Sequence, residues 1–89
     1  MSDAKSESMP YLNFSTFVMS LVSSGMVHLD EVPDPETGQR GLDLPLAKQT
    51  IDLLTMLQEK TKGNLDQNEE RLLQDVLFEL RMVYVRKKG

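Results

Sequence analysis

The chain has 89 residues, no cysteine and a formal net charge of −4 at pH 7. A chain of this length forms one domain, whose single core is marginal unless metal, disulfides or oligomerisation supplement it. Because cysteine is absent, disulfides, thiolate metal sites, cysteine nucleophiles and thiol redox chemistry are excluded.

Charged residues are unevenly distributed along the chain. The acidic ones concentrate between residues 30 and 43, where a single basic residue, Arg40, accompanies Asp30, Glu31, Asp34, Glu36 and Asp43. The basic residues are scattered, and only Arg86, Lys87 and Lys88, at the C-terminal end, form a group. Since proteins that bind nucleic acids carry a broader basic surface, we predict no nucleic-acid partner.

The two ends of the chain differ in composition from its middle. Residues 1–10 are small and polar and end in Pro10, so we predict a disordered N-terminal tail. We expect a single helical domain over residues 11–86 and a basic C-terminal tail over residues 87–89. No apolar signal segment is visible near the N-terminus, and we expect a cytoplasmic location.

The first predicted helix lies in a stretch from Ser8 to Leu29 that contains no Asp, Glu, Lys or Arg. It should begin near Asn13 or Ser15, both favourable N-cap residues. A surface helix normally keeps a charged face, so a helix without one is expected to be buried on most of its circumference. We therefore predict that its apolar stripe anchors an interface with another chain, through Phe14, Phe17, Val18, Leu21 and Val22.

A loop should follow over residues 30–43. The sequence Asp34-Pro35-Glu36-Thr37-Gly38 is typical of a turn, with proline fixing φ and glycine free to adopt a positive φ. On either side of this turn, Val32 and Leu42 could pair as a very short hairpin.

The second and third helices have clear boundary signals. The second should begin near Leu44-Pro45, capped by Asp43 or Leu44, and end before Gly63. The third should begin with a capping box formed by Asp66 and Glu69. Because the connection between them is short, we predict an antiparallel helical hairpin.

The third helix carries two sets of apolar residues. One set follows a core-facing pattern for nearly four turns: Leu72, Leu73, Val76, Leu77, Leu80, Val83 and Tyr84. Phe78, Met82 and Val85 fall outside that stripe and indicate a second contact surface.

Several segments resemble a small bacterial family known as domain of unknown function 1844. They are Asn13-Phe14-Ser15-Thr16-Phe17, the turn from Pro33 to Gly38, Leu46 to Asp52, Leu57 to Leu65, Glu70 to Leu73, and Leu80 to Val85. The similarity covers about residues 11 to 85. The resemblance implies a helical bacterial protein, and it implies no reaction, ligand or catalytic residue.

The side chains offer little for catalysis, cofactor binding or membrane insertion. His28 is the only histidine, and zinc or iron sites usually need several imidazole or thiolate ligands, so we predict no metal, cofactor or catalytic residue. The first helix is too short and too rich in serine to span a bilayer, and it lacks basic flanks, so we predict no membrane span.

These observations favour an all-α, three-helix protein completed by oligomerisation through its first helix. We interpret it as a non-enzymatic assembly or adaptor module, a homodimer or a module docked on a helical partner. The alternative is a small-ligand carrier or enzyme subunit with a pocket near the loop, at His28, Asp30 and Arg40.

Overall fold

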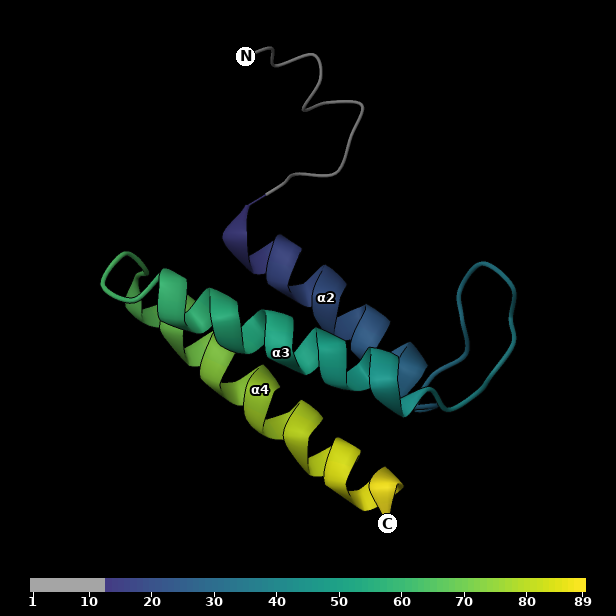
Figure 1. Cartoon of the computed structure of the whole chain (residues 1–89). Coiled ribbons are helices and arrows are strands. Elements are labelled where there is room, and N and C mark those ends of the chain that lie inside the picture. Colours follow the sequence, from purple (N-terminus) through teal and green to yellow (C-terminus); the bar gives the residue numbers. More distant parts are fainter. Residues whose placement is uncertain (1–12) are drawn as a thin grey trace, which may run out of the picture.

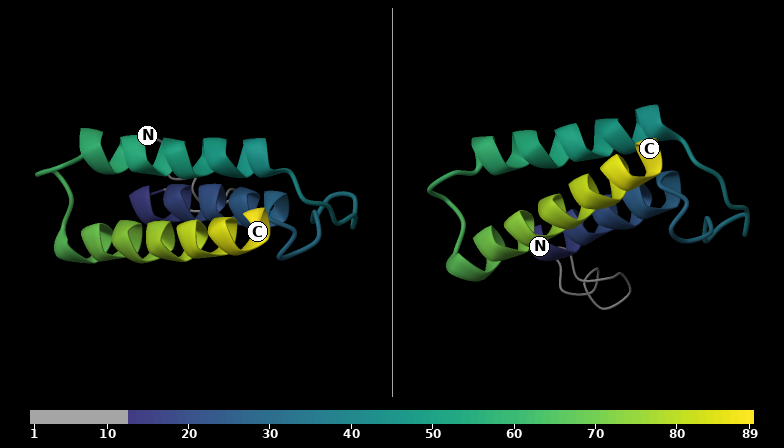
Figure 2. Two further views of the ribbon diagram at one scale, coloured as in Figure 1. Left: turned by 60° about the horizontal axis from the view of Figure 1, so that its bottom comes forward. Right: turned by 90° about the horizontal axis from the view of Figure 1, so that it is seen from below.

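The computed structural model describes residues 13–89, and this part of the chain folds into three helices (Figure 1). They are α2 (Phe14–His28), α3 (Leu44–Lys60) and α4 (Gln67–Lys88). Helices α2 and α4 run in one direction and α3 runs in the other, as the views in Figure 2 also show. The all-α fold class and the antiparallel α3/α4 hairpin are therefore confirmed.

Each helix begins at a side chain that caps its first turn. The Asn13 amide oxygen accepts a hydrogen bond from the backbone N–H three residues later, at 2.8 Å. The Asp43 carboxylate caps α3 in the same way, at 3.1 Å. At α4, Asp66 accepts from the N–H of Glu69 and the Glu69 carboxylate accepts from the N–H of Asp66, which completes the predicted capping box. Of the alternatives left open by the sequence, the caps are thus Asn13 and Asp43.

The core lies where the three helices face one another. Its fully or nearly fully buried apolar residues are Val18, Val22, Leu29, Ala47, Ile51, Leu54, Leu73, Leu77, Leu80 and Val83. Both neighbouring helices lie close to Gly25, where a Cβ atom would lie 3.2 Å from Thr50 Cγ2 and 3.3 Å from Leu80 Cδ2. Gly25 therefore makes room for both neighbouring helices at once.

The loop between α2 and α3 is closed at its base and shaped by local hydrogen bonds. The base is a bridge between Leu29 and Leu42, so the partner of Leu42 is Leu29 and not Val32. At the tip, the N–H of Gly38 donates to the carbonyl of Asp34 at 2.7 Å, and Gly38 has a φ of +73°. The predicted turn is confirmed.

Helix α2 ends in a Schellman motif. Asp30 adopts a left-handed φ of +60°, and the N–H of Glu31 donates to the carbonyl of Met26 at 2.9 Å. Asp30 tolerates this conformation better than most residues because its short polar side chain can bond locally. The Arg40 guanidinium donates to the Asp30 carboxylate at 3.2 Å and to the Asp30 carbonyl at 2.9 Å. These two bonds hold the second half of the loop against the C-terminal end of α2.

The C-terminal end of α4 is attached to the start of the loop. Helix α4 includes Lys87 and Lys88, which the sequence assigned to a tail beginning at residue 87. Lys87 Nζ lies 3.1 Å and Arg86 Nη2 lies 3.3 Å from Glu31 Oε2. The hydrogen bond from Lys87 is the main reason why the pKa of Glu31 lies below its ordinary value. The predicted N-terminal tail, residues 1–10, lies outside the described residues.

Candidate interaction surfaces

The structure divides the five residues predicted to form an interface on the first helix. Val18 and Val22 lie in the core of the single chain, with 0% and 8% of their surface exposed. Phe14 and Leu21 are half-buried and pack against that core, whereas Phe17 is 43% exposed. Their role between chains stays a prediction, and Phe17 is the one whose side chain is largely accessible.

The outer face of α2 is uncharged but consists mainly of short hydroxyl side chains. Ser20, Ser23 and Ser24 are exposed there, and Phe17 and Met19 stand at the edges of this face. The Ser20 hydroxyl donates to the carbonyl of Phe17 at 2.7 Å. The face therefore offers little apolar area between its two edges.

The outer face of α4 is different, because three large apolar side chains follow one another along it. Phe78, Met82 and Val85 are 65%, 54% and 67% exposed. Residues spaced by four and then three positions share one face of a helix. This face, which we call the α4 outer stripe, points away from the core-facing side that carries Leu73 and Leu80.

A shallow groove of about 570 Å³ runs beside the α4 outer stripe. Its walls include Gln58 from α3 and Gln74, Leu77 and Arg81 from α4. The Arg81 guanidinium donates to the Thr55 hydroxyl of α3 at 2.8 Å, which fixes one wall. Sequence reasoning did not single out the two glutamines or Arg81. Gln74 and Arg81 could have been found as helical neighbours of Phe78, whereas Gln58 is brought there only by the α3/α4 packing.

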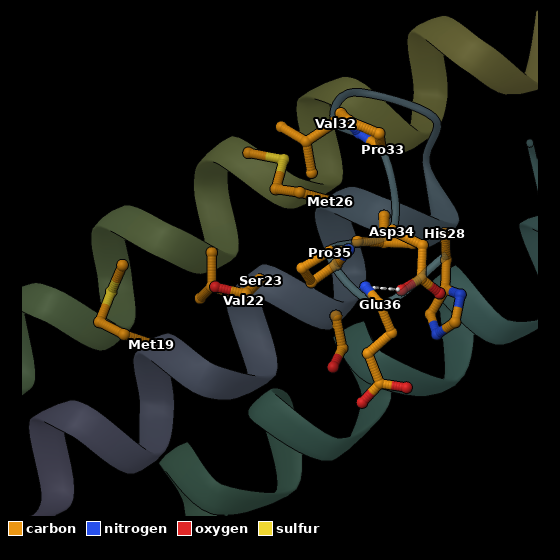
Figure 3. A pocket seen from close by; sticks show the side chains of 12 residues that line it. Met19, Val22, Ser23, Met26, His28, Val32, Pro33, Asp34, Pro35 and Glu36 are labelled. Carbon is orange, nitrogen blue, oxygen red and sulfur yellow. Dashed lines mark hydrogen bonds between the residues drawn. The ribbon is translucent and has the colours of Figure 1, made fainter. Parts of the chain in front are cut away.

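A second hollow, of about 680 Å³, lies where the loop folds beside α2 (Figure 3). Met19 and Met26 of α2 and Val32 and Pro33 of the loop give it apolar walls, and His28 lies at its edge. Two further residues that the sequence placed at a pocket here, Asp30 and Arg40, pair with each other and do not line the hollow.

The loop end of this hollow is acidic. Asp34 and Glu36 lie there, and the Asp34 carboxylate accepts a hydrogen bond from the backbone N–H of Glu36 at 2.8 Å (Figure 3). Within residues 13–89, no cluster of three or more histidine, aspartate and glutamate side chains is suited to hold a metal ion. Across the same part of the chain, no helix is both long enough and apolar enough to cross a bilayer.

Residues 11–86 match the model of a protein family described as a domain of unknown function, DUF1844. The match covers most of the chain, so the chain belongs to this family, as the resemblance of its segments predicted. Comparison with curated proteins finds no match, and neither does comparison with solved structures.

Proposed function

We propose that this member of the DUF1844 family is a non-enzymatic assembly module that docks through the α4 outer stripe, on a second copy or on a helical partner. The observation that supports it is the exposure of Phe78, Met82 and Val85 on the side of α4 away from the core. The proposal assigns no catalytic residue and no cofactor, and it keeps the expected cytoplasmic location in bacteria.

The energetic argument rests on what these side chains gain from a partner. Full burial of a large apolar side chain stabilises by about 1.5–3 kcal/mol relative to exposure, and aromatic residues and methionine are enriched in interface centres. The fold does not need these three side chains, since the buried residues of α4 lie on its other side. An apolar stripe of this kind is typical of a helix that docks against another helix or into a groove.

Photo-crosslinking in cells of the native host tests the proposal. The variant Phe78→benzoylphenylalanine should give a defined adduct, and adding Met82→Glu should remove that adduct, because a charge then stands in the apolar contact. The matched control places benzoylphenylalanine at Gln49, an exposed residue of α3. An adduct that survives Met82→Glu, or the absence of any adduct from position 78, would contradict the proposal.

The hollow beside the loop supports a second candidate function, the binding of a small apolar molecule by a carrier or enzyme subunit. Its volume and its methionine, valine and proline walls suit such a ligand. An uncharged apolar fluorescent dye such as Nile red should bind the native protein. The variant Ser23→Trp should abolish this binding, because the indole fills part of the hollow. Ser23 is exposed and is not part of the core, so the fold should tolerate the change. Unchanged dye binding would exclude the hollow as the site.

A further inference from the structure

We infer that the occupant of the α4 outer stripe is a second copy of this chain, packed antiparallel about a two-fold axis beside Met82. The inference rests on the proposed function, because it names the partner of the same surface. It is carried by the length of the stripe, the order of charges along α4 and the shape of the adjoining groove.

The α4 outer stripe is short, because non-apolar residues follow it in both directions along the helix. Phe78, Met82 and Val85 take the d, a and d positions of a heptad, the spacing by which two helices pack side by side. The next a positions hold Asp75 on one side and Gly89 on the other. The apolar surface therefore covers only about two turns centred on Met82. The same stripe of a second copy, crossing the first at Met82, has the same length and therefore covers all of this apolar surface.

The charges of α4 change sign along its length. Its N-terminal half holds the acidic residues Glu69, Glu70, Asp75 and Glu79. Its C-terminal half holds the basic residues Arg81, Arg86, Lys87 and Lys88, and Arg71 is the one basic residue in the acidic half. A parallel copy in register would align like charges. An antiparallel copy that crosses at Met82 instead places Asp75 and Glu79 opposite residues 85–89, the end of the helix that holds Arg86, Lys87 and Lys88. Helix dipoles also favour the antiparallel arrangement.

One ion pair follows from this arrangement and occurs twice by symmetry. Glu79 and Arg86 come directly after Phe78 and Val85, so both flank the stripe on the same side, at e positions. When Met82 meets Met82 of the second copy, Glu79 lies opposite Arg86 of that copy. Glu79 takes part in none of the ion pairs found within residues 13–89. In the part of the chain that the structure describes, Arg86 has one ionic contact, with Glu31. Its side chain is 62% exposed, so its guanidinium keeps donors for another carboxylate.

The groove beside the stripe makes the surface self-complementary. Phe78, Met82 and Val85 themselves line the groove, together with other residues of α4 and with Gln58 of α3. In a two-fold dimer the same patch is used by both subunits, so the apolar side chains of each copy can lie in the shallow groove of the other. A contact built around three apolar side chains from each copy lies at the small end of the range of protein interfaces, where complexes are weak, and we therefore expect a dissociation constant on the order of micromolar.

Sedimentation equilibrium of the purified protein tests the dimer. The wild type should reach twice the chain mass at about 200 µM, well above a micromolar dissociation constant. Glu79→Arg alone and Arg86→Glu alone should each weaken association at least about tenfold, because each puts two like-charge pairs into the dimer. The double variant Glu79→Arg/Arg86→Glu restores unlike pairs and should regain dimerisation. A wild-type monomer at that concentration overturns the inference.

Disulfide trapping tests the antiparallel orientation. The chain has no cysteine of its own, so every disulfide formed must involve the introduced cysteines. A mixture of the Glu79→Cys and Arg86→Cys variants should form the mixed disulfide faster than either variant links to itself. Met82→Cys should link to itself, and Gln49→Cys on α3 should not. Preferential self-linking of Glu79→Cys would indicate a parallel pair and overturn the inference.

The two proposals fail in different ways. A monomeric protein whose Phe78→benzoylphenylalanine variant still gives an adduct of another mass in cells, lost with Met82→Glu, rejects the second copy and retains the docking surface. A monomeric protein without such an adduct rejects both.

Discussion

Helices α2 and α4 differ in two properties, the number of charged residues that they contain and the amount of apolar surface that they expose. Helix α2 contains no Asp, Glu, Lys or Arg, yet its outer face consists mainly of serine hydroxyls. Helix α4 is rich in charge, yet it exposes Phe78, Met82 and Val85. The position of each apolar side chain relative to the core therefore decides the available apolar surface, and the charge count of a helix does not.

The same contrast explains what α2 does for the fold. Its apolar stripe turns toward α3 and α4 and contributes Val18 and Val22 to the core, and Leu29, the residue directly after the helix, joins them. Gly25 lets both neighbours approach it. Helix α4 supplies the core from one side and retains a second apolar side, which is more than a three-helix core requires.

The largest effect should come from a charge on the inner face of α2. Val18→Asp buries an unpaired carboxylate at a fully buried position and should destabilise the fold by more than about 4 kcal/mol, enough to unfold a small domain. Ser20→Asp, on the outer face of the same helix, is the control and should leave the unfolding free energy nearly unchanged. Urea denaturation followed by circular dichroism measures both. Equal effects of the two variants would contradict the assignment of inner and outer faces.

The two faces of α4 can be separated by truncating one side chain on each. Leu73→Ala removes a fully buried side chain and should cost about 2–5 kcal/mol of unfolding free energy. Phe78→Ala should cost less than about 1 kcal/mol in the monomer, since the ring is 65% exposed, and should weaken self-association. Dilute-solution denaturation and sedimentation measure the two effects. A loss of several kcal/mol in monomeric Phe78→Ala would show that the ring belongs to the core.

A smaller effect is expected where the three helices meet. Gly25→Val should cost about 1–3 kcal/mol, because the Cβ atom alone would lie 3.2 Å from Thr50 Cγ2 and 3.3 Å from Leu80 Cδ2, and the two methyl groups crowd these buried side chains further. Ser24→Val, one residue earlier and exposed, is the control for placing a valine in this part of the helix. Thermal melts of the two variants give the difference. If both variants shift the melting temperature equally, the close approach at Gly25 does not contribute to the stability of the fold.

The smallest effect concerns the contact between the loop and the end of α4. Hydrogen bonding from Lys87 and the nearby Arg86 charge hold the pKa of Glu31 below its ordinary value of 4.5. A carboxylate with a lowered folded-state pKa stabilises fully above the unfolded pKa, and this contribution disappears as pH falls through the folded pKa. The melting temperature of Glu31→Gln should therefore lie slightly below that of the wild type above about pH 5 and converge with it in more acidic solution. A difference that is independent of pH would exclude this ion pair as its cause.

Sequence reasoning succeeded where structure depends on neighbouring residues. The caps at Asp43 and Asp66 and the turn at Gly38 follow from side chains that bond to backbone groups a few positions away. The apolar stripe of α2 could be recognised in the sequence, but its packing against α3 and α4 of the same chain could not, because an apolar stripe does not show whether its partner lies in the same chain or in another. The contact of Glu31 with Lys87 joins residues far apart in the chain, so no local pattern indicates it.

The candidate surface was only partly visible in the sequence. The three residues of the α4 outer stripe could be recognised because they fall outside the core pattern of α4. The groove beside them could not, because Gln58 reaches it only through the packing of α3 on α4.

The most direct test of a docking surface on α4 is the concentration dependence of the melting temperature, compared between the wild type and Met82→Glu. Association stabilises the folded state by mass action, so the wild-type melting temperature should rise with protein concentration. Met82→Glu should melt at one temperature throughout, equal to that of the wild type at high dilution, because Met82 is 54% exposed and outside the core. A wild-type melting temperature independent of concentration, or a rise that Met82→Glu leaves intact, would contradict self-assembly through α4.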